Sequence, residues 1–294
     1  MSVASKAAGF AIALRFVYHA AAPATAGDGA VPLVLILSVI GVLSMTGGNL
    51  AALRQNHLRR VLAYSSVSHG GMMLVGVVAL AWGRFMHDET LAASALVSVV
   101  LYLYAYMLAT VCAFSSVLAL ENEGHAVEVW EFRGMSRRNP LLAVCFLVAL
   151  LSLLGVPPAL GFFGKLIMFR TAMEAAFAST AVAVVLVAAL ANTALSAAYY
   201  FRIAREMFLT DAVRGTYRPF SLGRTATLVT GGTAAATVVL FIFVGLAESP
   251  LRSMLVGPRG QPAVLEPARQ QASPQGRGLD GANAPGSVRE AGGR

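Results

Sequence analysis

Charged residues are scarce in this sequence. Of its 294 residues only 12% are charged, about half of the share in an average soluble protein, whereas 57% are hydrophobic. A soluble domain needs more charged groups to cover its surface, and a disordered chain needs far lower hydrophobicity, so the composition excludes both classes. The net charge of +8 is compatible with a nucleic-acid-binding protein. The arginines, however, lie in short segments between apolar runs and not on one face, which argues for no nucleic-acid partner.

Cysteines are few, and the common cofactor motifs are absent from the sequence. Cys112 and Cys145 both lie inside apolar runs, where cysteine is typical of a small core residue and not of a disulfide or metal pair. The sequence has no Walker loop, no CxxC, no dinucleotide fingerprint and no pair of histidines at helical spacing for a haem. It therefore predicts that this chain binds no cofactor and no metal.

Lysine is almost absent. Only two of the 22 basic residues are lysines, Lys6 and Lys165, and both lie in apolar stretches. Arginine stays protonated at any accessible pH, whereas a lysine ammonium can lose its proton when it is removed from water. A GC-rich genome would explain why lysine is rare, but not why both lysines lie where a charge is costly. Ionisable residues inside a membrane are typically functional, so we take Lys165 and Lys6 as candidate proton-carrying residues.

Long apolar runs make up most of the chain. A helix needs about 20 apolar residues to cross about 30 Å of hydrocarbon, and seven runs have about that length or more. They cover residues 3–22, 31–51, 61–82, 91–120, 140–176, 179–204 and 224–247. We therefore predict an all-α polytopic membrane protein with a transmembrane domain over 1–250. Residues 251–294, rich in Gly, Pro, Gln and Arg, are predicted to form a disordered tail.

The arginines between these runs predict the orientation of the chain. Eleven arginines lie in or beside the loops after the second, fourth and sixth runs, and only Arg84 and Arg170 in those after the first, third and fifth. Loops rich in Lys and Arg remain in the cytoplasm. We therefore expect the first residue on the cytoplasmic side and the C-terminus outside. Residues 24–26 imitate a signal-peptide cleavage site, but Arg15 and His19 interrupt the preceding apolar run, so we prefer a retained helix.

The fifth run contains a helix break. Pro157 and Pro158 are followed by Gly161 and Gly164, and consecutive prolines lack amide donors and clash with the preceding turn. Broken helices persist in membranes where they are packed in protein or line a wet cavity, and freed carbonyls beside an amine suit a proton or ion site. We therefore expect Pro157, Pro158 and Gly164 to support a site at Lys165. A packing kink alone would explain the prolines but not the lysine.

Polar side chains recur at helical spacing in three runs. Ser65 and His69 are four residues apart on one face of the third run, with Tyr64 beside them. A neutral imidazole suits a proton relay near pH 7, but hydrogen-bonded packing explains a lone histidine equally well, so both interpretations stay open. Other polar residues recur in the fourth and sixth runs. Those of the fourth run either hold a chain of water molecules or join helices, and we favour joining for its serines; for the sixth run we favour helix packing. These residues are Ser94, Ser98, Tyr102, Tyr106 and Thr110, and Asn192, Ser196, Tyr199 and Tyr200.

Several segments resemble subunit N of bacterial NADH–quinone oxidoreductase (respiratory complex I). The segment GNLAALRQ at 48–55, followed by RRVLAYSSVSH at 59–69, resembles a loop and the helix after it in that family. The segment SLLGVPPALGFFGK at 152–165 resembles the family's broken helix with its lysine, a theme that antiporter-like relatives share. Residues 5–8 and 191–202 resemble the lysine-bearing central helix and the penultimate helix.

The resemblance implies the C-terminal half of an antiporter-like bundle built from inverted repeats. Lys6 would correspond to the central lysine of the family's proton path and Lys165 to the lysine near its exit, with His69 as a candidate link between them. NADH, FMN, iron–sulfur clusters and quinone would be bound by other subunits. Those membrane subunits and the lipid bilayer are the implied partners, together with a missing N-terminal half of the same subunit. The implied location is the bacterial inner (plasma) membrane.

The implied function is a proton-translocating membrane subunit that couples electron transfer from NADH to quinone with proton pumping. The enzyme is then the whole NADH:quinone reductase, and activity of the isolated chain is left open. Two alternatives are a cation/proton antiporter subunit of the same superfamily and a non-catalytic fragment that only scaffolds its neighbours.

Overall fold

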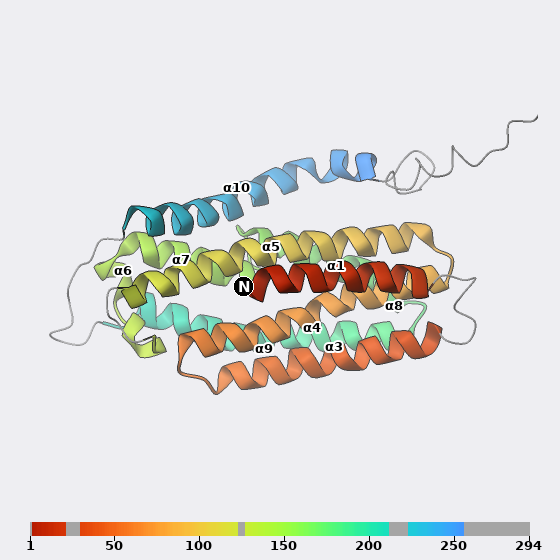
Figure 1. Ribbon diagram of the computed structural model, residues 1–294, viewed down its shortest axis with the longest axis horizontal. Helices are drawn as coiled ribbons and strands as arrows, with labels where there is room; N and C mark the ends of the chain where they lie inside the picture. Colours follow the sequence, from red (N-terminus) through yellow and green to blue (C-terminus); the bar gives the residue numbers. More distant parts are fainter. Residues whose placement is uncertain (1, 22–29, 123–126, 212–222, 256–294) are drawn as a thin grey trace, which may run out of the picture.

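The computed structural model describes residues 2–21, 30–122, 127–211 and 223–255. The described residues form a bundle of helices that run along one long axis, with no β-strand among them (Figure 1). The helices are α1 (Ser2–Ala20), α3 (Ala30–Leu53), α4 (Leu58–Phe85), α5 (Glu89–Asn122), the short η2 (Val129–Phe132) and α6 (Met135–Arg138), α7 (Pro140–Leu154), α8 (Leu160–Ala176), α9 (Thr180–Phe208) and α10 (Arg224–Leu255).

The fifth apolar run forms two helices, α7 and α8, which are separated by residues 155–159. Asn139 begins α7, because its side-chain oxygen accepts a hydrogen bond of 3.0 Å from the Leu142 amide and Pro140 follows at the first helical position. Gly155 ends α7 in the left-handed conformation, with a φ of 85°, which is open to glycine at no steric cost. Local sequence signals thus set both ends of this half-helix.

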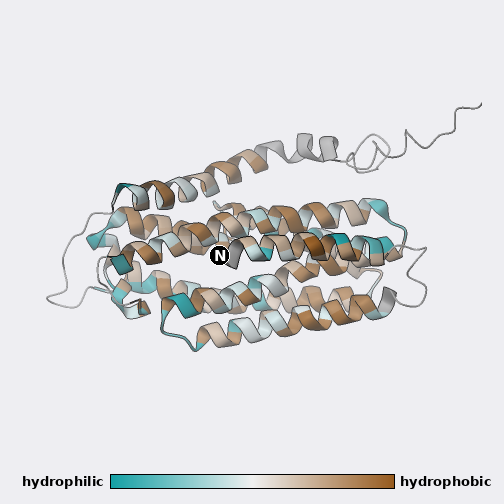
Figure 2. Ribbon diagram, in the orientation of Figure 1, coloured by the Kyte–Doolittle hydropathy of each residue, from teal (hydrophilic) through white to brown (hydrophobic). Residues whose placement is uncertain are grey.

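Apolar residues cover much of the outer surface of the bundle. Five of the described helices, α3, α4, α5, α9 and α10, contain segments long and apolar enough to cross a membrane, and α7 is a shorter apolar helix. Figure 2 shows hydrophobic residues along the lengths of the helices and hydrophilic ones mainly at the two ends of the bundle. Large side chains such as Ile12, Leu43 and Val187 are more than half exposed, as expected for a surface that meets lipid.

One end of the bundle gathers most of the ion pairs. The loop after α3, the end of α5, η2, α6 and the end of α9 all lie at this end (Figure 1). The ion pairs there join Arg59 to Glu121, Arg137 to Asp211, and Arg133 and Arg205 to Glu206. At the opposite end Arg84 pairs with Glu89. The α10 helix continues to Leu255, past residue 250 where the tail was expected to begin, and the rest of that tail lies outside the described residues.

Helix α4 occupies the centre of the bundle and packs against α1, α3, α5, α8 and α9. Helices α3 and α4 approach each other closely because glycines lie where they contact. A Cβ on Gly48 of α3 would lie 2.7 Å from the Ser68 backbone nitrogen, and one on Gly71 of α4 would lie 2.6 Å from the Met45 nitrogen. Polar side chains on the inner face of α4 can therefore meet residues from several of these neighbouring helices.

Candidate functional site

His69 lies at the centre of a buried polar cluster on α4. Its side chain is 4% exposed, and each ring nitrogen contacts a tyrosine hydroxyl from another helix. The Nδ1 atom is 2.6 Å from the Tyr102 hydroxyl of α5, and the Nε2 atom is 3.1 Å from the Tyr200 hydroxyl of α9. The Tyr106 ring also packs against the imidazole, with 5.2 Å between ring centroids. His69 thus joins three helices through hydrogen bonds and an aromatic contact.

Lys6 reaches this cluster from α1, which begins near the middle of the bundle (Figure 1). Its ammonium donates hydrogen bonds to the Ser66 carbonyl of α4 and, at 3.3 Å, to the Tyr106 hydroxyl of α5. The ammonium also lies 5.3 Å from the centre of the Tyr106 ring, within cation–π range. Tyr106 therefore contacts both Lys6 and His69.

Lys165 is buried on α8, just past the helix break. Its ammonium donates a hydrogen bond of 2.8 Å to the Leu154 carbonyl at the end of α7. In an unbroken helix the amide of residue 158 would bond that carbonyl, but residue 158 is proline and has no amide hydrogen. The carboxyl end of a helix also carries partial negative charge, which favours a cation there. The break therefore creates the binding site for the Lys165 ammonium.

Small residues let α8 approach its neighbours closely. A Cβ on Gly164 would lie 3.0 Å from Tyr102, the tyrosine that is hydrogen-bonded to His69. The Gly161 amide donates a hydrogen bond of 3.2 Å to the Ser152 hydroxyl of α7, across the break. Contacts thus connect the half-buried Lys6 with Tyr106, His69 and Tyr102, and Lys165 follows Gly164, which packs against Tyr102. We call Lys6, Tyr106, His69, Tyr102 and Lys165 the buried row.

A second polar branch extends from His69 toward α3. The Tyr200 ring packs against the Tyr199 ring, with 4.4 Å between ring centroids, and the Tyr199 hydroxyl donates to Asn49 Oδ1 at 3.1 Å. The Asn49 amide group donates to the Asn192 backbone oxygen at 2.9 Å and to its side-chain oxygen at 3.0 Å. Asn192 in turn donates to Thr46 at 3.0 Å. This branch connects α4, α9 and α3.

The residues singled out from the sequence do not all meet. Ser65 is 2% exposed and lies beside Tyr200, whereas the Tyr64 side chain is 39% exposed and does not join the cluster. Tyr64 precedes His69 by five residues, which places it about 140° around the helix, whereas Ser65 lies about 40° away. Sequence reasoning left Tyr102 and Tyr106 open between a water chain and a helix contact, favoured packing for Tyr199 and Tyr200, and proposed none of the four as a site residue. Asn49 was named only as part of the GNLAALRQ segment and was not proposed as a site residue. Its position as a polar residue inside an apolar run could have indicated it.

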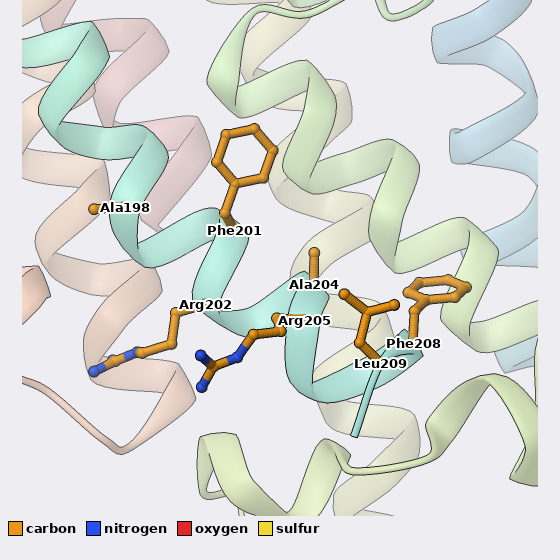
Figure 3. Close-up of a pocket in the computed structure, with 7 residues that line it drawn as sticks. All are labelled: Ala198, Phe201, Arg202, Ala204, Arg205, Phe208 and Leu209. Atoms are coloured by element: carbon orange, nitrogen blue, oxygen red, sulfur yellow. The ribbon is translucent and has the colours of Figure 1, made fainter. Parts of the chain in front are cut away.

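The described residues hold no group of three or more His, Cys, Asp or Glu side chains that suits a metal ion. Cys112 and Cys145 are buried free cysteines, and the Cys112 sulfur lies 3.4 Å from the Cys145 carbonyl oxygen. A surface hollow lined by residues of α9 lies apart from the buried row, and Figure 3 shows its lining side chains along that helix, among them Arg202, Arg205, Phe201, Phe208 and Leu209. Arg202 there donates to the Leu53 and Gln55 carbonyls at the end of α3, so it fastens two helix ends.

Comparison with known proteins shows the family to which the chain is similar. A family model described as "NADH:quinone oxidoreductase/Mrp antiporter, TM" matches residues 1–191. The chain is 32% identical over 254 residues to NADH-quinone oxidoreductase subunit N 2 of Chloroherpeton thalassium, an alignment that covers 85% of this chain and 46% of that protein. The chain thus spans about half the length of the curated relatives it matches.

Two solved complexes contain similar chains. A chain of respiratory complex I from Thermus thermophilus superposes with a TM-score of 0.54 at 32% identity, covering 72% of this chain and 44% of that one. A chain of the Mrp complex from Dietzia superposes with a TM-score of 0.56 at 21% identity, covering 74% and 45%. The second likeness concerns the fold alone.

Proposed function

The chain belongs to the NADH:quinone oxidoreductase/Mrp antiporter transmembrane family, and from this membership we propose that it is a proton-translocating membrane subunit of NADH–quinone oxidoreductase. The family and the fold class predicted from the sequence, an all-α polytopic membrane protein with an antiporter-like fold, are both confirmed. The observation that carries the proposal is that Lys6, Tyr106, His69 and Tyr102 are connected across α1, α5 and α4, and that Lys165 on α8 follows the glycine that packs against Tyr102.

Lys6 and Lys165 carry the proton in turn. Each amine is held by a carbonyl oxygen inside an apolar bundle, where the charged form is costly and small changes in nearby charge or hydration alter its proton affinity. Redox energy released in other subunits supplies that change. His69 lies between the two amines and accepts and releases a proton as a neutral imidazole can. Each amine takes its proton from one side of the membrane and releases it toward the other.

The partners are other membrane subunits of the complex, in the bacterial inner membrane. The relative in Chloroherpeton is named as a subunit, and the similar solved chains come from multi-chain complexes. NADH, FMN, iron–sulfur clusters and quinone bind to other subunits, because no cofactor motif occurs in this sequence. The arginine-rich end of the bundle faces the cytoplasm and the C-terminus lies outside it.

The test replaces Lys165 with methionine in the whole complex. Methionine keeps a flexible side chain of similar length but holds no proton. Membrane vesicles that carry Lys165→Met should lose most NADH-driven acidification, measured with a pH-sensitive dye, while quinone reduction is followed separately. Lys165→Arg should also fail, because arginine keeps its proton at any accessible pH. Unchanged acidification in either variant would contradict the role given to Lys165.

A matched control is available on the same helix. Arg170 also lies on α8, but it is 55% exposed and pairs with Glu174 at 3.6 Å. Arg170→Met removes a cation from α8 without touching the buried row, so it should leave acidification and quinone reduction close to wild type. A loss equal to that of Lys165→Met would mean that α8 tolerates no loss of charge, and the proton-carrying role would fail.

Tyr106→Phe tests the contact between Lys6 and His69. The substitution removes the hydroxyl that accepts the Lys6 hydrogen bond at 3.3 Å and keeps the ring. A hydrogen bond to a charged group contributes about 1.5 kcal/mol or more, so we expect proton translocation to slow about tenfold. Tyr104→Phe is the control, because Tyr104 lies on α5 but is 50% exposed. Equal rates in the two variants would remove Tyr106 from the path.

A cation/proton antiporter subunit is the second candidate, because the family description itself names the Mrp antiporter and the fold is shared with an Mrp chain. The same vesicles distinguish the two functions. In the absence of NADH, an imposed pH gradient that collapses on addition of Na⁺ in these vesicles, but not in vesicles that lack the chain, would indicate an antiporter. Normal acidification in all point variants, with a complex that fails to assemble when the chain is deleted, would indicate a scaffold.

A further inference from the structure

The two half-helices at the break cap each other. An α-helix leaves its first amides without a partner in the helix, and the residue that precedes α8 is Ala159, whose side chain accepts no hydrogen bond. The Gly161 amide in the first turn of α8 donates instead to the Ser152 hydroxyl of α7 at 3.2 Å. In the opposite direction, the Lys165 ammonium of α8 donates to the Leu154 carbonyl of α7 at 2.8 Å. Each half-helix thus supplies a side chain that satisfies a backbone group at the end of the other.

Both of these hydrogen bonds lie on one face of α8. Gly161 and Lys165 are four residues apart, so they lie one above the other on the helix. A Cβ on Gly161 would lie 1.8 Å from the Ser152 carbonyl oxygen, and the first turn of α8 therefore lies directly against the last turn of α7. The position of that first turn determines where the Lys165 side chain, one turn later, reaches α7.

The two caps differ in their chemistry. The hydrogen bond from the Gly161 amide to the Ser152 hydroxyl joins two neutral groups, so it keeps the same strength whether or not Lys165 carries a proton. The bond from Lys165 to Leu154 is strong only while the amine is charged. Ser152 and Lys165 are 2% and 4% exposed, so both bonds lie inside the bundle. Ser152 is therefore the cap that holds the break when the lysine gives up its proton.

We propose that Ser152 is a positioning residue for Lys165. By accepting the Gly161 amide, its hydroxyl holds the first turn of α8 against the end of α7, and this contact keeps the Lys165 ammonium at the Leu154 carbonyl. The inference rests on the proposed proton path, in which Lys165 carries the proton, and it adds the group that returns the lysine to the same place after each transfer.

Replacement of Ser152 by alanine separates a positioning role from a structural one. Ser152→Ala removes the acceptor of the Gly161 amide, and a buried donor without an acceptor is costly. The first turn of α8 should move to relieve this cost, and Lys165 should move with it. If the hydroxyl only stabilised the fold, the same variant would unfold more easily but leave the ammonium at the Leu154 carbonyl.

The test observes the position of the ammonium directly. The whole complex, with ¹⁵N in its lysine side chains and ¹³C in its leucine carbonyl groups, is studied by solid-state NMR in native membranes. Dipolar dephasing selects the lysine nitrogens that lie next to a leucine carbonyl carbon. The Lys165 signal is assigned as the dephased signal that disappears in Lys165→Met. Wild type should show this signal, and Ser152→Ala should lose its dephasing.

Two further variants serve as controls. Ser116 on α5 is also fully buried, but it donates to the Cys112 carbonyl of its own helix at 2.8 Å. Ser116→Ala removes the same oxygen atom away from the break, so it should leave the Lys165 signal dephased. Ser152→Thr keeps a hydroxyl that can accept the Gly161 amide, and it should also keep the dephased signal.

The same membranes show whether the position of the ammonium matters for transport. NADH-driven acidification should slow about tenfold in Ser152→Ala, as expected when a hydrogen bond to a charged group is lost, and stay close to wild type in Ser116→Ala. Dephasing that persists in Ser152→Ala would overturn the inference, and so would its loss in Ser116→Ala or in Ser152→Thr. Acidification at the wild-type rate in Ser152→Ala would also overturn it. Because dephasing reports a distance and not transport, these NMR outcomes are separate from failure of the Lys165→Met acidification test.

Discussion

Gly155 and Lys165 are packed so closely that a side chain at position 155 must displace that of Lys165. A Cβ on Gly155 would lie 2.7 Å from Lys165 Cδ, and the Gly155 φ of 85° is in the left-handed region. The residue that ends α7 therefore also leaves the space through which the lysine side chain reaches the Leu154 carbonyl. The backbone turn and the position of the ammonium depend on the same glycine.

Gly155→Ala should accordingly harm both stability and function. The left-handed conformation costs a non-glycine residue about 1–2 kcal/mol, and the new methyl group must displace the lysine side chain. We expect lower thermal stability of the complex in detergent and a loss of NADH-driven acidification approaching that of Lys165→Met. Acidification at the wild-type rate in a correctly assembled Gly155→Ala complex would show that the position of Lys165 tolerates this displacement.

The α3–α4 contact offers a sharper comparison, because Gly70 and Gly71 are adjacent on α4 and differ in their surroundings. A Cβ on Gly71 would lie 2.6 Å from the Met45 backbone nitrogen and 2.7 Å from the Gly41 carbonyl oxygen, whereas one on Gly70 would meet nothing within 4 Å. Gly71→Ala should therefore push the helices apart and destabilise the fold by about 1–3 kcal/mol. The measurement is the free energy of unfolding in detergent.

Gly70→Ala is the control for that measurement. Alanine is a better helix former than glycine by about 1 kcal/mol, so this variant should be as stable as wild type or more stable. Equal destabilisation by the two substitutions would mean that α4 is sensitive to any added methyl group, and the close approach of α3 would not be the cause.

The helix break and its lysine were predictable because they depend on local sequence. Two prolines end a helix wherever they occur, and the missing amide hydrogen of Pro158 identifies the carbonyl that needs another donor. Both lysines also stood out by position alone, as charges in apolar runs. The family resemblance added roles for Lys6, His69 and Lys165, but no geometry.

The hydrogen bonds of His69 were not predictable, because its partners are distant in sequence. Tyr102 and Tyr200 are 33 and 131 residues away. Helical periodicity places His69 on a face of α4, but which helices cover that face depends on the packing of the whole bundle. Tyr64 lies outside the cluster for a related reason, because two residues that are close in sequence can lie on different faces of a helix.

Glu206 and Asp211 allow a comparison of buried and exposed ion pairs at the arginine-rich end. The Glu206 carboxylate is 9% exposed and accepts hydrogen bonds from Arg133 at 2.7 Å and Arg205 at 3.0 Å. Glu206→Gln should destabilise the fold by about 1–3 kcal/mol, because it removes a charge that two arginines bond. Asp211 is 80% exposed and pairs with Arg137, so Asp211→Asn should change stability by less than about 1 kcal/mol. Chemical unfolding in detergent measures both, and a larger effect at Asp211 would reverse the argument.

The proposed orientation of the bundle is based on which end holds the arginines, and single cysteines can test it. Cys112 and Cys145 are replaced by serine, and one cysteine is then placed at Gln55, in the loop after α3, or at His87, in the loop after α4. These loops lie at opposite ends of the bundle (Figure 1). A membrane-impermeant maleimide added to intact spheroplasts should label His87→Cys if the loop after α4 faces outward, as we propose. Gln55→Cys should react only after the membrane is permeabilised, since arginine-rich loops remain in the cytoplasm. The opposite pattern would invert the bundle and exchange the sides from which Lys6 and Lys165 take up and release protons.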